Sequence, residues 1–184
     1  MQGAIAKRAE AEYASLSPAA REAVPWVFRR LVTFEHNHAT ARQAHIAELS
    51  NHPGATEVVQ RFIAANLIVA ARATGNHSGN GVVVISLAHE ALIESWPLLK
   101  NWVESQRENL KNHAAVTADT GRWIENNRQR DYLYRSGRPL DRAKALLDGD
   151  FLSKEEEEFV CASLGSVARQ QFEDALATGQ QLQQ

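Results

Sequence analysis

The sequence predicts a mainly helical α+β protein: a winged helix-turn-helix with one β-hairpin, followed by a helical connector. Two observations carry this prediction. Several segments repeat apolar residues at three- and four-residue spacing, which is typical of amphipathic helices. Between them, the β-branched runs 67–69 and 82–85 flank a Gly-, Asn- and Ser-rich segment, 74–81, which is typical of a β-hairpin with a long loop. We expect the winged helix over residues 1–95 and the connector over 96–184.

The N-terminal part is expected to contain four helices before the hairpin, the third of them a short one over 45–49. Ser17 is a typical N-cap, and Pro18 follows it at the first helical position. Pro25 predicts that this second helix is kinked or split in two. That helix is expected to extend to Val32, and the stretch 35–42 that follows it is polar. Thr56 is expected to cap the helix that precedes the hairpin.

From His89 onward the pattern is helical. Trp96, Leu99 and Trp102 lie on one helix face, and we expect them to form core that couples the winged helix to the connector.

In the last helix, Ser153 and Glu156 match a capping box. The acidic run 155–158 is interpreted as a solvated face, and Cys161 as a buried apolar residue.

The composition excludes several classes of protein. Among 184 residues there are 20 Lys and Arg against 22 Asp and Glu, so a net charge of −2 creates no general attraction for nucleic acid or anionic lipid. A single cysteine excludes an internal disulfide and a multi-thiolate zinc site. No apolar run is long enough for a bilayer, and we expect a cytoplasmic protein without membrane contact.

No catalytic or metal-binding set is expected. His89 and Glu90 begin like a zincin helix, but Ile93 occupies the place of the second histidine, so a hydrolase built on them lacks a partner. His38, His45 and His52 fall in different expected elements, and solvated loop histidines explain them better than a metal does. No glycine is followed by lysine, which excludes a Walker A motif.

A winged helix also suggests the alternative function of a DNA-binding transcriptional regulator. The helix in the recognition position, 56–65, carries one cation, Arg61, and one anion, Glu57. No Lys or Arg occurs between 74 and 84. Proteins that read the major groove place several cationic or amide side chains on these elements, so the charges favour no nucleic-acid partner.

His89 differs from the other histidines because it directly follows an apolar strand and precedes a helix. That position suits contact with a phosphate group. Position alone favours the simpler reading, in which the histidine ends the strand and packs locally.

The segment from Val84 to Leu99, which reads apolar strand, His-Glu-Ala-Leu and then Trp-Pro, resembles a signature of bacterial STAND-class signalling NTPases. These are related to the NB-ARC and NLR families and often end in WD-repeat propellers. Upstream, the segments 6–17 and 28–32 look like the helices that enter the winged-helix domain of such proteins. Downstream, Trp123, the segment 131–133 and the segment 138–140 look like the connector before the sensor repeats.

The resemblance implies a non-catalytic regulatory and coupling module. In such proteins the nucleotide, ADP or ATP with Mg, lies between an upstream P-loop domain and the winged helix. The winged-helix histidine, here His89, contacts the β-phosphate of ADP and holds the inactive form; the role of Glu90 stays open. The implied partners are the upstream NTPase domain and the downstream sensor repeats of the same polypeptide, and the resemblance also allows oligomerisation of the parent on activation. The isolated chain, which lacks the P-loop, is expected to hold no cofactor.

Overall fold

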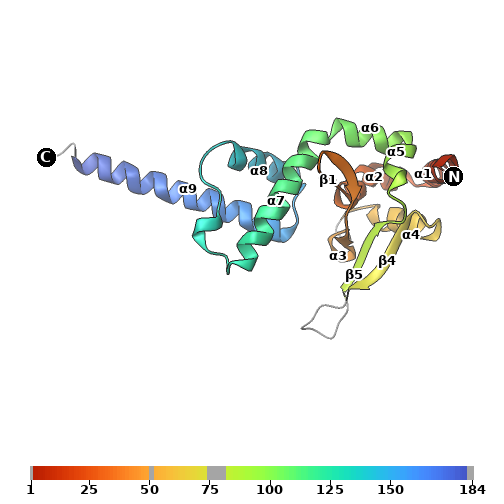
Figure 1. Cartoon of the computed structure of the whole chain (residues 1–184), viewed down its shortest axis with the longest axis horizontal. Coiled ribbons are helices and arrows are strands. Elements are labelled where there is room, and N and C mark those ends of the chain that lie inside the picture. Colours follow the sequence, from red (N-terminus) through yellow and green to blue (C-terminus); the bar gives the residue numbers. More distant parts are fainter. Residues whose placement is uncertain (1, 50–51, 74–81, 182–184) are drawn as a thin grey trace. The chain divides into compact units, whose positions relative to one another are not determined.

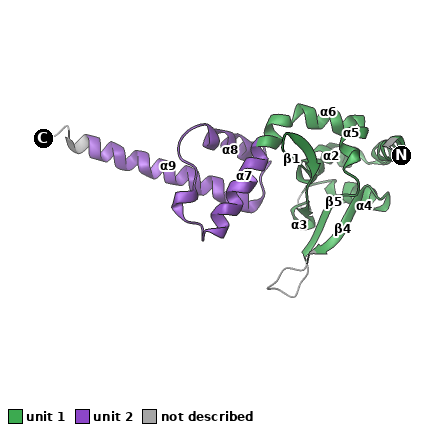
Figure 2. Ribbon diagram, viewed as in Figure 1, with its two compact units in different colours: residues 1–111 green, residues 112–184 purple. Residues whose placement is uncertain are grey.

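The computed structural model describes residues 2–49, 52–73 and 82–181, which fall into two compact units, residues 1–111 and 112–184 (Figure 2). The predicted mainly helical α+β class is confirmed. The expected hairpin loop, 74–81, lies outside the described residues.

The elements of unit 1 are α1 (Gln2–Ser15), α2 (Pro18–Leu31), β1 (Val32–Glu35), β2 (His38–Ala41), β3 (Ala44–His45), α3 (Ile46–Leu49), α4 (Ala55–Ala64), β4 (Ile68–Ala73), β5 (Val82–Leu87), α5 (Ala91–Ser95) and α6 (Pro97–Ser105) (Figure 1). The unit boundary lies within α7 (Arg107–Glu125), and η1 (Arg130–Tyr132), α8 (Arg138–Asp148) and α9 (Lys154–Gln181) belong to unit 2.

The beginning of α2 follows the sequence prediction. The Ser17 hydroxyl accepts a hydrogen bond from the Ala20 N–H at 3.2 Å, and proline occupies the first turn. The helix continues through Pro25 as one element, so the predicted split is wrong. Its buried side chains, including Phe28 and Leu31, hold it against the core, and this packing offsets the backbone hydrogen bond that proline cannot make.

The N-cap of α4 is Gly54, two residues before the predicted cap Thr56. Gly54 has a φ of 80°, and a Cβ added there would lie 2.5 Å from the backbone oxygen of Ala19. Only glycine combines this left-handed conformation with so close an approach between the start of α4 and α2.

Unit 1 contains two small antiparallel sheets. In the first of them β5 is central, with the strand order β3-β5-β4. The predicted hairpin is formed by β4 and β5, in a register that pairs Ile68 with Leu87 and Ala73 with Val82. The added strand β3 pairs Ala44 with Ile85.

The second sheet is a hairpin of β1 and β2. It begins at Val32, which was expected in the preceding helix, and includes most of the polar stretch 35–42. Its turn residues His36 and Asn37 have φ values of 47° and 71°, the sign combination of a tight two-residue hairpin turn. Val32 and Phe34 alternate with less buried residues, and this period of two was the signal in the sequence.

The core of unit 1 gathers helices and sheet around large aromatic side chains. The Trp96 ring has edge or tilted contacts with Phe28, Phe62 and Tyr13, at centroid distances between 5.7 and 6.0 Å. Leu99 and Val103 of α6 are buried in the same cluster. The helix α6 therefore belongs to unit 1, which extends to residue 111, and the boundary expected between 95 and 96 stays a prediction.

Unit 2 has its own core, formed by one side of α7, by α8 and by the first half of α9. Its buried residues are Val116, Trp123, Ala143, Leu146, Phe151, Leu152, Phe159 and Val160. Within the described parts of the chain, none of the helices has the length and apolar content that crossing a membrane requires.

Candidate functional site

His89 lies at the end of β5, in the short turn before α5. The strand end is fixed by a hydrogen bond from the Ala88 N–H to the Leu67 carbonyl at 2.9 Å, and the turn by one from the Leu92 N–H to the His89 carbonyl at 3.0 Å. The imidazole itself is exposed to solvent. The backbone is therefore held while the side chain is open to solvent.

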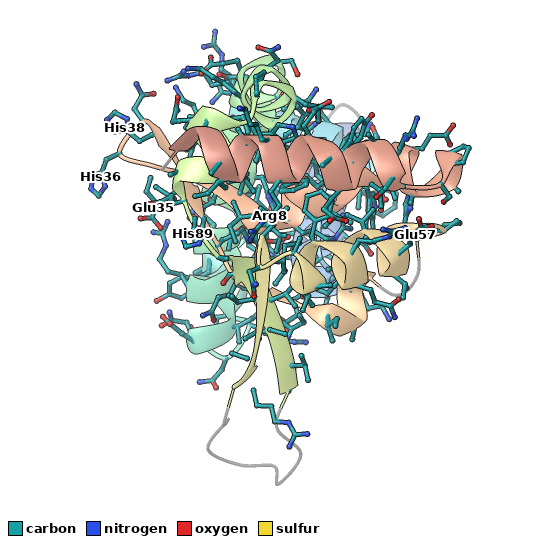
Figure 3. All side chains as sticks on the ribbon, turned by 90° about the vertical axis from the view of Figure 1, so that its right-hand side faces the viewer. Arg8, Glu35, His36, His38, Glu57 and His89 are labelled. Atoms are coloured by element: carbon teal, nitrogen blue, oxygen red, sulfur yellow. The ribbon has the colours of Figure 1, made fainter. Side chains whose placement is uncertain are left out.

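The residue after His89 is bonded to the β1–β2 hairpin. The Glu90 carboxylate accepts a hydrogen bond from the Ala41 N–H of β2 at 2.9 Å. The Arg8 guanidinium of α1 donates to the Ala65 carbonyl, just before β4, at 3.2 Å. In the view of Figure 3, His89 lies on the same side as Glu35 and the hairpin turn, and Glu57 lies on the opposite side.

The other candidate histidines are not brought together. His38 pairs with Glu35 across the hairpin, His45 lies on β3, and the His52 ring stacks on Trp26 at 4.6 Å. No group of three metal-ligating side chains occurs among the residues that the structure describes. These histidines therefore supply no candidate metal centre.

The helix α4, which the winged-helix prediction places in the recognition position, has both of its charged side chains bonded within the chain. The Glu57 carboxylate accepts hydrogen bonds from the Ser17 hydroxyl at 2.6 Å and the Ser17 N–H at 3.0 Å. These two bonds lower the pKa of Glu57. Arg61 lies 3.7 Å from the Glu12 carboxylate. Both charges therefore hold α4 to α1 and to the start of α2.

Trp96, Leu99 and Trp102 all contribute to the core of unit 1. Trp96 is fully buried, and its indole N–H donates to the Glu10 carboxylate at 2.8 Å. Leu99 is also buried, whereas Trp102 is partly buried against the same cluster. Trp96 follows the sheet in sequence but contacts Glu10 and Tyr13 of α1, so it helps to hold the N-terminal helix against the core.

The family model for novel STAND NTPase 1 matches residues 1–131. The chain belongs to this family. The match includes all of unit 1 and the α7 segment that follows it, and therefore the whole surroundings of His89. No curated protein and no solved structure matches the chain.

All of α8 and α9 in this STAND-family chain lies beyond the matched residues, and the start of α9 joins α7 in a buried polar cluster that the sequence analysis missed. Ser153 and Glu156 form the predicted capping box, with the Ser153 N–H donating to the Glu156 carboxylate at 2.8 Å. Glu156 is only 3% exposed, so the prediction of a solvated face is wrong for this residue. His113 donates to it at 3.0 Å and Thr117 at 2.5 Å.

These contacts determine the charge state of Glu156. Burial by itself raises the pKa of the carboxyl, but the hydrogen bond and charge of His113, with the bonds from Ser153 and Thr117, lower it to about 2. The sequence signal for this cluster was the capping box alone, because the spacing of 43 residues between His113 and Glu156 follows no local pattern. Cys161, predicted as buried, is exposed, because Phe159 and Val160 take the positions that face the core.

Unit 2 of this STAND-family chain also has a groove of about 570 Å³ between the 130–136 segment and α9. Arg130 and Arg135 line it together with Asp131 and Asp174. The Arg130 guanidinium is already bonded to the Ser166 hydroxyl at 3.0 Å. Because cations and anions are balanced in the groove, its charge favours no class of ligand.

Proposed function

We propose that this chain is the winged-helix regulatory and coupling module of a STAND-type NTPase and performs no catalysis of its own. The family match over residues 1–131 is the observation that carries this proposal. The arrangement of unit 1 supports the winged-helix part. Its helices α2, α3 and α4 precede the β4–β5 hairpin, and the short strand β3 completes an antiparallel sheet in the order β3-β5-β4.

The proposed role of His89 is to donate a hydrogen bond to the β-phosphate of ADP that is bound by an upstream P-loop domain. Its exposed imidazole at a fixed strand end supports this role. The helix that follows, α5, has only five residues, so the imidazole rather than a helix terminus would make the contact. A hydrogen bond to a charged group is worth about 1.5–3 kcal/mol, which is enough to shift a two-state equilibrium about ten-fold or more.

The cofactor and partners follow from the same proposal. ADP or ATP with Mg would be held by the P-loop domain, because no glycine of this sequence is followed by the lysine of a Walker A motif. That domain and downstream sensor repeats, which in related proteins are often WD-repeat propellers, would contact this module. Oligomerisation of the parent would accompany activation, and the cytoplasm would be its compartment.

The first test uses the chain alone. Calorimetric titration with Mg-ATP and with ADP should show weak binding or none, because one imidazole replaces only a small part of a phosphate-binding loop. Micromolar affinity together with ATP turnover would overturn the proposal.

The second test uses a polypeptide in which a STAND P-loop domain precedes this chain. His89→Ala should speed the release of ADP about ten-fold or more and leave ATP binding intact. The fold should be unchanged, because an exposed side chain contributes little packing. His45→Ala, an exposed histidine on β3 of the same sheet, is the matched control and should leave ADP release unchanged. Unaltered ADP release in the His89 variant would assign the histidine a merely local role.

The DNA-binding alternative is weakened by the contacts of α4. Its single cation, Arg61, is paired with Glu12, and Glu57 is bound to Ser17. A DNA reader should bind random duplex DNA at low salt with an affinity that falls steeply as salt increases. We expect no such binding, and a steep salt dependence would favour the alternative.

A further inference from the structure

Glu90 connects the turn that carries His89 to a part of the chain far away in sequence. It is exposed, yet its carboxylate accepts the Ala41 N–H at the end of β2, a bond that joins residues 49 positions apart. A hydrogen bond to a charged acceptor is among the stronger polar contacts of a protein surface. The turn and the β1–β2 hairpin are therefore tied together directly beside His89.

The hairpin is bound a second time, to the start of α7. The Arg107 guanidinium and the Lys111 ammonium lie over the Phe34 ring, at 5.3 and 5.9 Å from its centroid. Arg107 also donates to the Asn37 carbonyl in the hairpin turn at 3.2 Å. Glu104 accepts from the same guanidinium at 3.1 Å and so holds it in place. The ring of Phe34 is buried.

A hairpin of two four-residue strands is marginal by itself, so these outside contacts decide its position. One end is set by Glu90 and the other by Arg107. Between them runs the regular β1–β2 register, from Val32 paired with Ala41 to Glu35 paired with His38. A displacement of the His89 turn would thus move the hairpin, and the hairpin would move the first turn of α7.

We propose that Glu90 is a positioning residue that holds His89 in place and links it, through the β1–β2 hairpin, to Arg107 at the start of α7. The ligand of His89 in this proposal is taken from the proposed function, whereas the contacts that form the link lie within this chain. Since α7 continues past the boundary of unit 1, the link would carry the state of the nucleotide site into the connector.

The link is tested first in the full chain without nucleotide, by NMR. Glu90→Ala should raise the exchange rate of the Ala41 amide about ten-fold and shift the imidazole resonances of His89. Glu90→Gln keeps an acceptor oxygen and should largely restore both. The control Glu94→Ala removes an exposed carboxylate that pairs with Lys100 at 3.1 Å, and it should change neither readout.

Arg107→Ala then tests the coupling. It should also shift the His89 resonances, and this effect should largely disappear in a Glu90→Ala background, because the path is then already broken. The proposal is wrong if Glu90→Ala changes neither the exchange rate of the Ala41 amide nor the imidazole resonances of His89. Equal effects of Arg107→Ala in both backgrounds would overturn it as well.

Measurement of ADP release in the polypeptide with a P-loop domain separates the two proposals. Glu90→Ala should speed release in the same direction as His89→Ala, with rescue by Glu90→Gln. If His89→Ala acts and Glu90→Ala does not, the positioning role is wrong and the proposed function stands. If neither acts while the NMR coupling is present, the proposed function is wrong and the link stands.

Discussion

Replacing Glu156 by alanine removes the acceptor that three donors of unit 2 share. The carboxylate is 3% exposed and its partner His113 is 2% exposed. His113, Thr117 and the Ser153 N–H donate to it at 3.0, 2.5 and 2.8 Å. Breaking a buried charged pair from one side costs about 3–5 kcal/mol, because the remaining partner stays buried without compensation. Domains are stable by only about 5–15 kcal/mol, so the loss should be large.

The assay is urea unfolding combined with hydrogen exchange of the amides in residues 112–165. Glu155→Ala is the matched control: it removes an exposed carboxylate from the same helical turn, and its cost should be at most about 1 kcal/mol through the helix dipole. Glu156→Gln keeps one acceptor oxygen, enough for the donor on one side of the group, Thr117 or Ser153, but not for both, and its stability should fall between the two. A Glu156→Ala variant no less stable than the Glu155→Ala control would refute the role assigned to the cluster.

The remaining predictions concern pH dependence and the packing of unit 1. Since the pKa of Glu156 is about 2 in the folded chain against 4.5 as the ordinary value, the unfolded chain binds more protons between these values. The ionised carboxylate therefore contributes about 3 kcal/mol to the free energy of unfolding above pH 4.5, and this contribution is lost as the pH falls toward 2. Urea unfolding of unit 2 at a series of acid pH values measures the loss, and Glu156→Gln, which does not titrate there, should lack it. Trp96→Ala should cost about 3–5 kcal/mol and Trp102→Ala less, because Trp96 is fully buried and Trp102 is not; equal shifts of the urea midpoint would contradict this ranking. Gly54→Ala should destabilise unit 1 by more than about 1 kcal/mol through its positive φ and the clash with Ala19, and an unchanged melting temperature would show that the turn relaxes.

The sequence by itself determined the elements whose causes are local. A cap at Ser17 and a capping box at Ser153 act within one turn, so their residue types and spacing suffice to place the helix ends. The β-branched runs placed β4 and β5 for the same reason, since strand preference and alternation depend on neighbours in sequence. His89 could be singled out as the residue that follows a strand, because the apolar run before it is local in sequence.

Only the tertiary structure decided the contacts that span long stretches of chain. Glu90 reaches Ala41, Trp96 reaches Glu10, and His113 reaches Glu156, and no local period indicates any of these pairs. The same reason explains the errors. Whether a polar stretch becomes a hairpin, or whether an acidic residue is buried, depends on partners that folding brings from elsewhere, because the packing of whole elements overrides the preference of a short segment.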